Sequence, residues 1–270
     1  MMQWGMTSLI GHRDSFEHCC RYASRLGYGF IELNCVRDYF SHFNPLQLAD
    51  SPETLRRIRD VLAESGLRCS AVDCHGLFAR QPEGFAYSCD ALRAGFEIAS
   101  ALGSPVVATS IPGGGAPWEK MVSECAGLCR EAADRGLTVA VEAEYHFAVG
   151  TPDELERFLA CVDSPNLAVN FDPSHFVRAG YDIAETLRRF DGRIAHVHLK
   201  EYLPASAHPT RFTGEEGSPA SQMLDELRRL GYSGVASAET LAELDVDGEA
   251  AASEIMAGIR RWEQRIGGNL

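Results

Sequence analysis

The sequence predicts a single closed (β/α)8 barrel, and three observations support this prediction. Eight short apolar runs typical of strands alternate with helical patterns along the chain. The alternation shows no break in composition, which favours parallel strands joined by right-handed crossovers. The length of 270 residues is close to the roughly 250 residues usual for such a barrel. We therefore expect residues 1–270 to form one barrel domain.

The predicted strands are short runs rich in Val, Ile, Ala and Phe. An open doubly wound sheet is disfavoured, because such a sheet usually has a glycine-rich phosphate turn after its first strand, and the segment 6–11 lacks that fingerprint. The eight predicted strands are Gly5–Ile10, Phe30–Cys35, Cys69–Cys74, Pro105–Ser110, Thr138–Ala143, Leu167–Asp172, Ile194–Leu199 and Val235–Thr240.

The helices between these strands have recognisable starts and ends. Ser51 and Thr151 are each followed by proline and acidic residues, the pattern of an N-cap with proline in the first turn. Glycines just before four of the strands are expected to adopt the left-handed conformation that ends a helix. These glycines are Gly66, Gly103, Gly136 and Gly231.

The composition narrows the classes of function. A formal charge of −13 and a pI near 5.1 repel polyanions, so we expect no nucleic-acid partner. The nine cysteines lack the dense spacing of a small secreted scaffold and are expected to be reduced and mostly buried. No stretch of about 18 apolar residues indicates a membrane span, and no signal-like segment opens the chain, so a cytoplasmic protein is expected.

Four residues able to bind a divalent metal lie at the ends of four successive predicted strands. Glu142, Asp172, His198 and Glu239 are separated by 30, 26 and 41 residues. In a parallel barrel the ends of these strands meet at one mouth. A single acid at a strand end is often only a helix cap, but the set of four predicts one metal site. Mn2+, Mg2+, Co2+ and Zn2+ all suit this mixture of oxygen and imidazole ligands.

Two further residues are expected to contact a substrate at the same mouth. His175 follows Asp172 by three residues, in the turn that leaves the sixth predicted strand. Lys200 alternates with His196 and His198, so all three side chains should point into the barrel. We expect His198 to be the metal ligand, with His196 one layer deeper and Lys200 near the rim.

These residues resemble the xylose-isomerase-like barrel superfamily of sugar isomerases and epimerases. The likeness rests on Glu142, Asp172-x-x-His175, His196-x-His198-x-Lys200-Glu201, the Gly214-Glu-Glu-Gly turn, Glu239 and the segment Ala23–Leu33, and it spans nearly the whole chain. The resemblance implies that the four ligands hold one Mn-like ion, that His175 touches the substrate and that Glu142 and Glu239 also act as bases. It further implies a small carbohydrate substrate and a homo-oligomer, although no surface stripe identifies an interface.

The chain also departs from relatives in this superfamily. Ketohexose 3-epimerases have a glutamate and an arginine where this chain has Ala148 and Pro204. Lys200 followed by an acid is closer to the sugar-phosphate and inosose branches. Arg211 is a candidate for binding a phosphate or carboxylate, or else a solvated loop charge. His75 and Glu32 are expected to face the mouth, where each could contact the substrate.

The leading hypothesis is an isomerase or epimerase that forms a metal-stabilised cis-enediolate from a ketose or related polyol. Glu142 and Glu239 would act as base and acid on opposite sides of the enediolate plane. Two alternatives stay open at this point. One is an inosose-type dehydratase, a lyase that expels a hydroxyl group from the same intermediate. The other is a non-catalytic barrel that binds a metal or a sugar.

Overall fold

Eight parallel strands, β1 to β8 in sequence order, close into a barrel and confirm the predicted fold. The computed structural model describes residues 2–37, 40–74, 82–203, 209–240 and 247–267, and the side chains of Pro82 and Glu83 are not included. The strands are β1 (Gln3–Thr7), β2 (Phe30–Asn34), β3 (Arg68–Asp73), β4 (Val106–Ser110), β5 (Thr138–Glu142), β6 (Leu167–Phe171), β7 (Ile194–Leu199) and β8 (Val235–Ala238).

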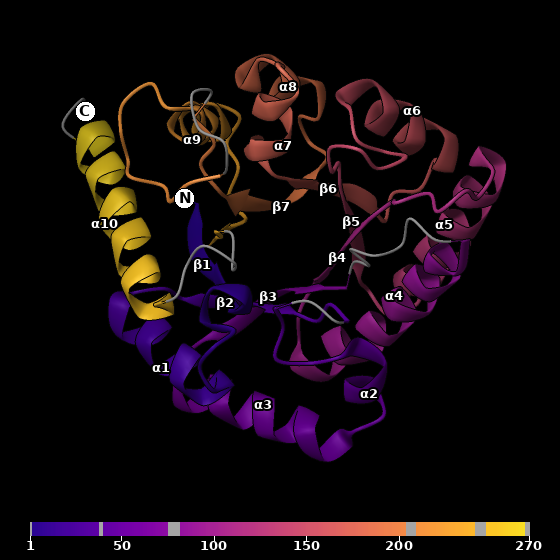
Figure 1. The fold of residues 1–270 in the computed structure, drawn as a ribbon, viewed down its shortest axis with the longest axis horizontal. Coiled ribbons are helices and arrows are strands. Elements are labelled where there is room, and N and C mark those ends of the chain that lie inside the picture. The colour runs from indigo at the N-terminus through magenta and orange to yellow at the C-terminus, as the bar shows by residue number, and fades with distance from the viewer. Residues whose placement is uncertain (1, 38–39, 75–81, 204–208, 241–246, 268–270) are drawn as a thin grey trace.

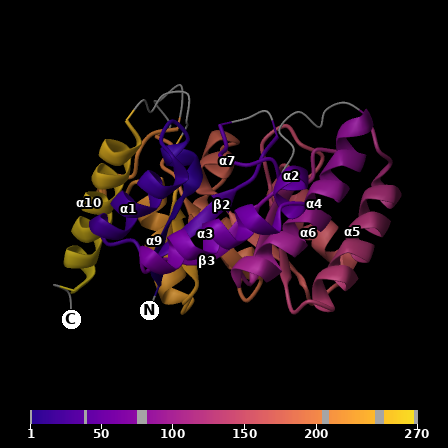
Figure 2. The same ribbon diagram turned by 90° about the horizontal axis from the view of Figure 1, so that it is seen from below.

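Helices surround the strands on the outside, as Figure 1 shows. Figure 2 shows α3 in front of β2 and β3, with α1 on one side and α4 on the other. The helices are the short 3-10 helix η1 (Ser8–Gly11), α1 (Phe16–Leu26), α2 (Pro45–Ala49), α3 (Pro52–Glu64), α4 (Pro82–Leu102), α5 (Trp118–Ala133), α6 (Pro152–Val162), α7 (Pro173–Arg178), α8 (Ile183–Arg189), α9 (Pro219–Arg229) and α10 (Gly248–Gly267).

The predicted helix signals are present in the structure. The Ser51 side chain accepts a hydrogen bond from the backbone N–H of Thr54 at the start of α3. Thr151 and Glu154 form a reciprocal capping box at the start of α6. The four predicted helix-ending glycines have φ of 67°, 69°, 68° and 74° in chain order, all in the left-handed region.

The first strand begins and ends earlier than the sequence predicts. The predicted strand Gly5–Ile10 is strand only up to Thr7, and Ser8 begins the 3-10 turn η1. The Ser8 hydroxyl accepts a hydrogen bond from the backbone N–H of Asn34, a group at the end of β2. This contact holds Ser8 outside the strand. Because it joins residues far apart in the chain, the apolar residues Leu9 and Ile10 give no sign of it.

The inside of the barrel changes from apolar at one end to polar at the other. Ala71, Val106 and Ala140 of β3, β4 and β5 form a small buried apolar cluster. Side chains two residues apart share a face of a strand, so Asp73 and Glu142 also point inward, nearer the carboxyl ends. The larger apolar core lies between the strands and the helices. All nine cysteines are free thiols, and eight of them are buried; Cys161 is the exposed one.

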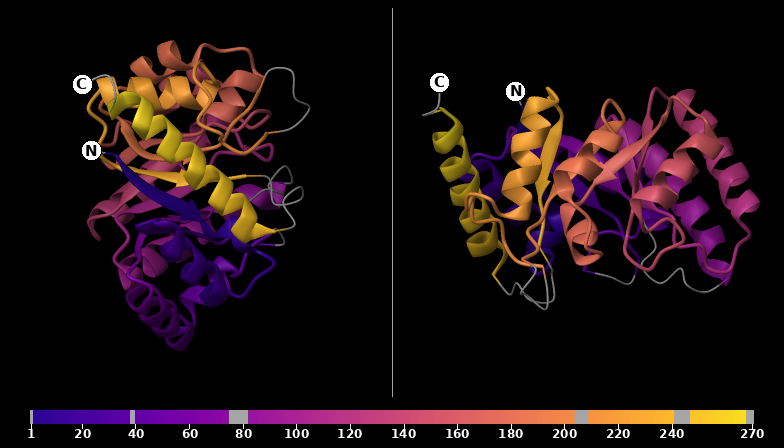
Figure 3. Two further views of the ribbon diagram at one scale, coloured as in Figure 1. Left: turned by 90° about the vertical axis from the view of Figure 1, so that its left-hand side faces the viewer. Right: turned by 90° about the horizontal axis from the view of Figure 1, so that it is seen from above.

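The last helix, α10, packs beside the first strand, β1. The indole N–H of Trp4 donates to Glu263 at 2.8 Å, and the Trp4 and Trp262 rings meet edge to face. Figure 3 shows α10 in yellow beside β1 in indigo. Gly258 of α10 lies against the segment that follows β7, where an added Cβ would come within 2.6 Å of the Phe212 carbonyl oxygen.

This close approach predicts opposite effects for two glycine-to-alanine substitutions in helices. Gly258→Ala should lower the free energy of unfolding by about 1–3 kcal/mol, because the methyl group must displace backbone atoms. Gly127→Ala in α5, where the nearest atom is 3.8 Å from the new methyl, should raise it by about 0.5–1 kcal/mol through helix propensity. Urea unfolding of both variants measures the two effects. A free energy of unfolding for Gly258→Ala equal to that of the wild type would contradict the proposed contact.

Candidate active site

The carboxyl ends of β5 to β8 bring the four predicted metal ligands together. Ligand atoms of Glu142, Asp172 and His198 all lie within 4.8 Å of one another. Glu239 joins them, since its Oε2 lies 2.7 Å from Nδ1 of His198, and Oε2 of Glu142 lies 3.2 Å from the same nitrogen. All four side chains are buried. The structure therefore contains one compact cluster of three carboxylates around one imidazole.

Local backbone structure sets the position of each ligand atom. Glu142 is the last residue of β5, and His198 lies within β7. Asp172 caps α7, with its Oδ1 accepting from the backbone N–H of Ser174 at 2.7 Å. This hydrogen bond leaves Oδ2 to face the cluster. Glu239 follows β8, and its backbone N–H donates to the Leu199 carbonyl at 3.2 Å.

Lys200 supplies a fixed positive charge inside the cluster. Its Nζ lies 2.9 Å from Oδ2 of Asp172 and 2.7 Å from Oε1 of Glu239. The side chain is buried, as the inward alternation along β7 requires. The chain contains only two lysines, Lys120 and Lys200. A compact ammonium is thus placed in the site of a chain whose strong bases, apart from Lys120, are otherwise arginines.

His175 lies at the outer edge of the same cluster. Its Nε2 is 3.4 Å from Oε1 of Glu142 and 3.7 Å from Oδ2 of Asp172. The backbone N–H of Tyr145 donates to its Nδ1, so any ring proton of the neutral imidazole lies on Nε2. The side chain keeps 21% of its surface exposed, more than the ligand side chains around it. His175 is therefore placed where it could reach a bound molecule.

A second polar layer lies beneath the ligands. Glu32 is fully buried, and its two oxygens contact Nε2 of His198 at 2.9 Å and Nε2 of His196 at 2.8 Å. The Ser237 hydroxyl lies 3.0 Å from Nε2 of His196. Asn170 donates from Nδ2 to Oε2 of Glu142 at 3.0 Å. Most barrels of this kind fill such layers with branched apolar side chains.

The predicted place of Glu32 at the mouth is wrong. Glu32 is the third residue of β2, and Asn34 is the one that ends the strand. Strand alternation puts both side chains on the inward face, with Glu32 one layer below Asn34. Sequence reasoning also missed Asn34, which donates to Oδ2 of Asp73 at 2.8 Å beside the mouth. Counting from the true strand end would have found both.

Two more residues, His75 and Arg211, are predicted to contact the substrate. His75 lies outside the described residues. Arg211 forms an ion pair with Glu254 of α10, at 2.6 Å between nitrogen and oxygen. A role of Arg211 in binding substrate stays a prediction.

The charges of the cluster shift the pKa values of its members. Burial opposes ionisation of Glu142, but His198 and His175 hold its pKa well below the usual value. Burial likewise opposes ionisation of Glu239, and Lys200 with His198 lowers its pKa to about 2. Burial disfavours charge on His198 as well, yet the three carboxylates around it raise its pKa well above normal. Both glutamates are thus ionised and weakly basic at neutral pH.

A divalent cation fits these residues. Nδ1 of His198 and Oε2 of Glu239 lie 2.7 Å apart, but neither atom makes a hydrogen bond to any described residue. Such buried, unsatisfied atoms are costly unless another group binds them. The charge points the same way, because with a neutral His198 ring, as a metal ligand must have, the four carboxylates of Glu32, Glu142, Asp172 and Glu239 are balanced chiefly by the ammonium of Lys200. A cation of charge +2 would remove most of this excess.

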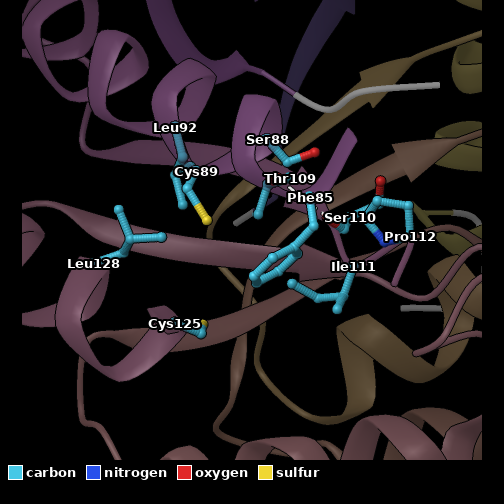
Figure 4. Close-up of a pocket in the computed structure, with 10 residues that line it drawn as sticks. All are labelled: Phe85, Ser88, Cys89, Leu92, Thr109, Ser110, Ile111, Pro112, Cys125 and Leu128. Carbon is cyan, nitrogen blue, oxygen red and sulfur yellow. Dashed lines mark hydrogen bonds between the residues drawn. The ribbon is translucent and has the colours of Figure 1, made fainter. Parts of the chain in front are cut away.

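A cavity of about 20 Å³ outside the strand wall is separate from this cluster. It lies between α4, α5 and the end of β4 (Figure 4). Its wall is mainly apolar, and its volume is about that of a single water position. Its lining residues include Phe85, Cys89, Leu92, Ile111, Cys125 and Leu128. This cavity offers no chemistry related to the cluster.

The sequence of this chain is similar to those of known proteins. The model of the xylose isomerase-like TIM barrel family matches residues 20–262. An inosose dehydratase from Clostridium botulinum is 29% identical over 87 residues, which cover 32% of this chain and 29% of that protein. The match thus spans less than a third of the curated relative.

Solved structures share the whole fold at low identity. A D-allulose 3-epimerase from Methylomonas sp., solved with D-allulose, has a TM-score of 0.77 and 20% identity, and the alignment covers 96% of each chain. The IOLI protein, solved with a zinc atom, has a TM-score of 0.77 and 17% identity over 97% of this chain and 99% of that one. Within the described part of the chain, no helix has both the length and the apolar character to cross a membrane. With a matching family model over most of its length and a closed eight-stranded barrel, the chain belongs to the xylose isomerase-like TIM barrel family.

Proposed function

We propose that this protein is a divalent-metal-dependent isomerase or epimerase of a sugar or sugar phosphate. Glu142, Asp172, His198 and Glu239 would hold the ion, with Mn2+ favoured. When bound, the ion supplies Lewis-acid polarisation of substrate oxygens. The observation that carries the proposal is the meeting of Glu142 and Glu239, from β5 and β8, at one face of His198.

The two glutamates are suited to move one substrate proton. Each places a carboxylate oxygen within 3.2 Å of Nδ1 of His198, so a molecule bound beside this point would have two carboxylates within reach, one from β5 and one from just after β8. One carboxylate removes a proton next to the carbonyl, and the other, after taking up a proton from water, passes that proton to the resulting enediolate. Return to the opposite face epimerises the carbon, whereas return to the neighbouring carbon isomerises the sugar.

Lys200 and His175 are the proposed substrate contacts. The Lys200 ammonium lies beside Glu239, so it can donate to a substrate oxygen near the reacting carbon. His175 lies beside Glu142 at the more open edge, and Asp172 with Glu142 raises its pKa against the effect of burial. Both side chains therefore offer hydrogen-bond donors toward an oxygen-rich substrate.

A dehydratase is the second candidate, because the curated relatives with matching segments include inosose dehydratases. The first step would be the same proton removal. The enediolate would then lose a hydroxyl group as water, and His175 is placed to supply the proton for that loss. Product mass separates the two reactions, since dehydration removes one water and epimerisation leaves the mass unchanged.

Glutamine substitutions test the two proposed bases. We expect Glu142→Gln and Glu239→Gln to slow proton exchange by about 100-fold or more, because an amide cannot accept the proton at useful rates. The measurement is deuterium uptake by NMR in D2O, with Mn2+-loaded protein and a panel of ketoses, ketose phosphates and inososes. Bound metal is quantified in each sample, so that loss of the ion is distinguished from loss of the base.

Glu226→Gln provides the matched control. Glu226 is also a buried glutamate, but it lies in α9 and pairs with Arg188 and Arg229. This variant should exchange deuterium at the wild-type rate. Wild-type exchange in either metal-loaded site variant would overturn the two-base scheme. No exchange by the wild type with any compound would overturn the enzymatic proposal for this panel.

Lys200→Met tests the charge balance of the metal-free site. Removing the ammonium takes away the cation that contacts both Asp172 and Glu239, so the metal-free protein should lose about 3 kcal/mol of unfolding free energy. Adding Mn2+ should reduce this difference, because the ion supplies positive charge to the same carboxylates. Chemical unfolding with and without Mn2+ measures both values. Lys120→Met, which alters the exposed lysine of α5, should leave stability nearly unchanged. An equal loss with and without Mn2+ would contradict this account.

A further inference from the structure

We infer that Glu32 is a positioning residue that holds His198 so that its Nδ1 faces the metal. The carboxylate would do this from the layer below the ligands, by accepting the Nε2 proton of His198. The inference rests on the proposed function, since it assumes that the cluster binds a divalent ion.

The contacts of Glu32 are directional and buried. Its Oε1 lies 2.9 Å from Nε2 of His198, and its Oε2 lies 2.8 Å from Nε2 of His196. The side chain has no exposed surface. The two imidazole rings stand at 90° to each other, with their centroids 5.9 Å apart. One carboxylate thus spans two histidines of β7 and uses a separate oxygen for each.

The chemistry of the carboxylate decides which nitrogen of His198 is left for a metal. An ionised carboxylate only accepts hydrogen bonds, so the nitrogen that faces Glu32 must carry the proton. That nitrogen is Nε2. Nδ1 also faces carboxylates, but these belong to Glu142 and Glu239, which are proposed metal ligands, so an ion held between them would replace a proton on Nδ1 and leave the one on Nε2 in place. Nδ1 is the atom that lies close to Glu142 and Glu239 and has no hydrogen bond to a described residue. The ring is therefore oriented with its ligand atom toward the cluster.

The cost of this arrangement supports a functional role. A carboxylate buried in the barrel interior is expensive to desolvate, and an apolar side chain of similar size often serves stability equally well. Carboxylates that accept from the second nitrogen of a metal-bound histidine fix the ring and strengthen it as a ligand. The contact between Glu32 and His198 matches that pattern. The second oxygen of Glu32 contacts His196, and Nε2 of His196 also lies within hydrogen-bond distance of the Ser237 hydroxyl.

Glu32→Gln tests the inference. The amide NH2 can turn toward Nε2 and favour a proton on Nδ1, which then competes with the metal. Competition with a chelator should show Mn2+ and Zn2+ bound about 10–100-fold more weakly than by the wild type. Glu32→Asp keeps a carboxylate and should recover part of the affinity. Glu226→Gln, which alters a buried glutamate in α9 away from the Glu32–His198 contact, should bind within about threefold of the wild type.

A second measurement uses the wild type and needs no variant to fold. Long-range 1H–15N NMR of the Zn2+-loaded protein should show a proton on Nε2 of His198 and a metal-bound Nδ1. A metal-bound Nε2 would overturn the inference. So would equal metal affinity of the wild type and Glu32→Gln, which would leave the proposed function intact. A wild type that binds no divalent ion would overturn the proposed function and the inference together.

Discussion

The site is organised by an excess of buried negative charge at the carboxyl end of the barrel. Glu32, Glu142, Asp172 and Glu239 place four carboxylates around His198 and Lys200. Carboxylates removed from water are tolerated only with cations or hydrogen-bond donors beside them. Lys200 and the imidazoles supply part of that compensation within the chain. The rest of the structure must hold these groups in place against their mutual repulsion.

The barrel provides that rigidity in layers. Ala71, Val106 and Ala140 fill one end with small apolar side chains, and polar side chains take over toward the other end. Each proposed ligand lies on or next to a strand that is hydrogen-bonded on both sides in a closed sheet. A site built on strands of this kind moves less than one built on loops. Glu32, His196 and Asn170 form a layer below the proposed ligands, in which Glu32 contacts His198 and Asn170 contacts Glu142.

The electrostatics of the site also limit its chemistry. Lys200 and His198 lower the pKa of Glu239 to about 2, and His198 with His175 keeps that of Glu142 well below normal. Carboxylates of this kind are poor bases toward an ordinary C–H bond. They become competent only toward a carbon that is already acidified, as in a proton next to a polarised carbonyl. Proton removal of that kind is a first step shared by epimerisation, isomerisation and dehydration.

The sequence by itself determined the fold and the membership of the cluster, because both depend on local patterns. Strand and helix alternation, the Ser51 and Thr151 caps and the glycines at helix ends are signals carried by neighbouring residues. Glu142, Asp172, His198 and Glu239 stand at strand ends, and a parallel barrel brings such ends together. Tertiary structure alone decided the place of Glu32, the ion pairs of Lys200 and the pairing of Arg211 with Glu254. Those contacts join residues far apart in the chain, and they depend on strand register and layer depth, which the spacing of residues along the sequence does not encode.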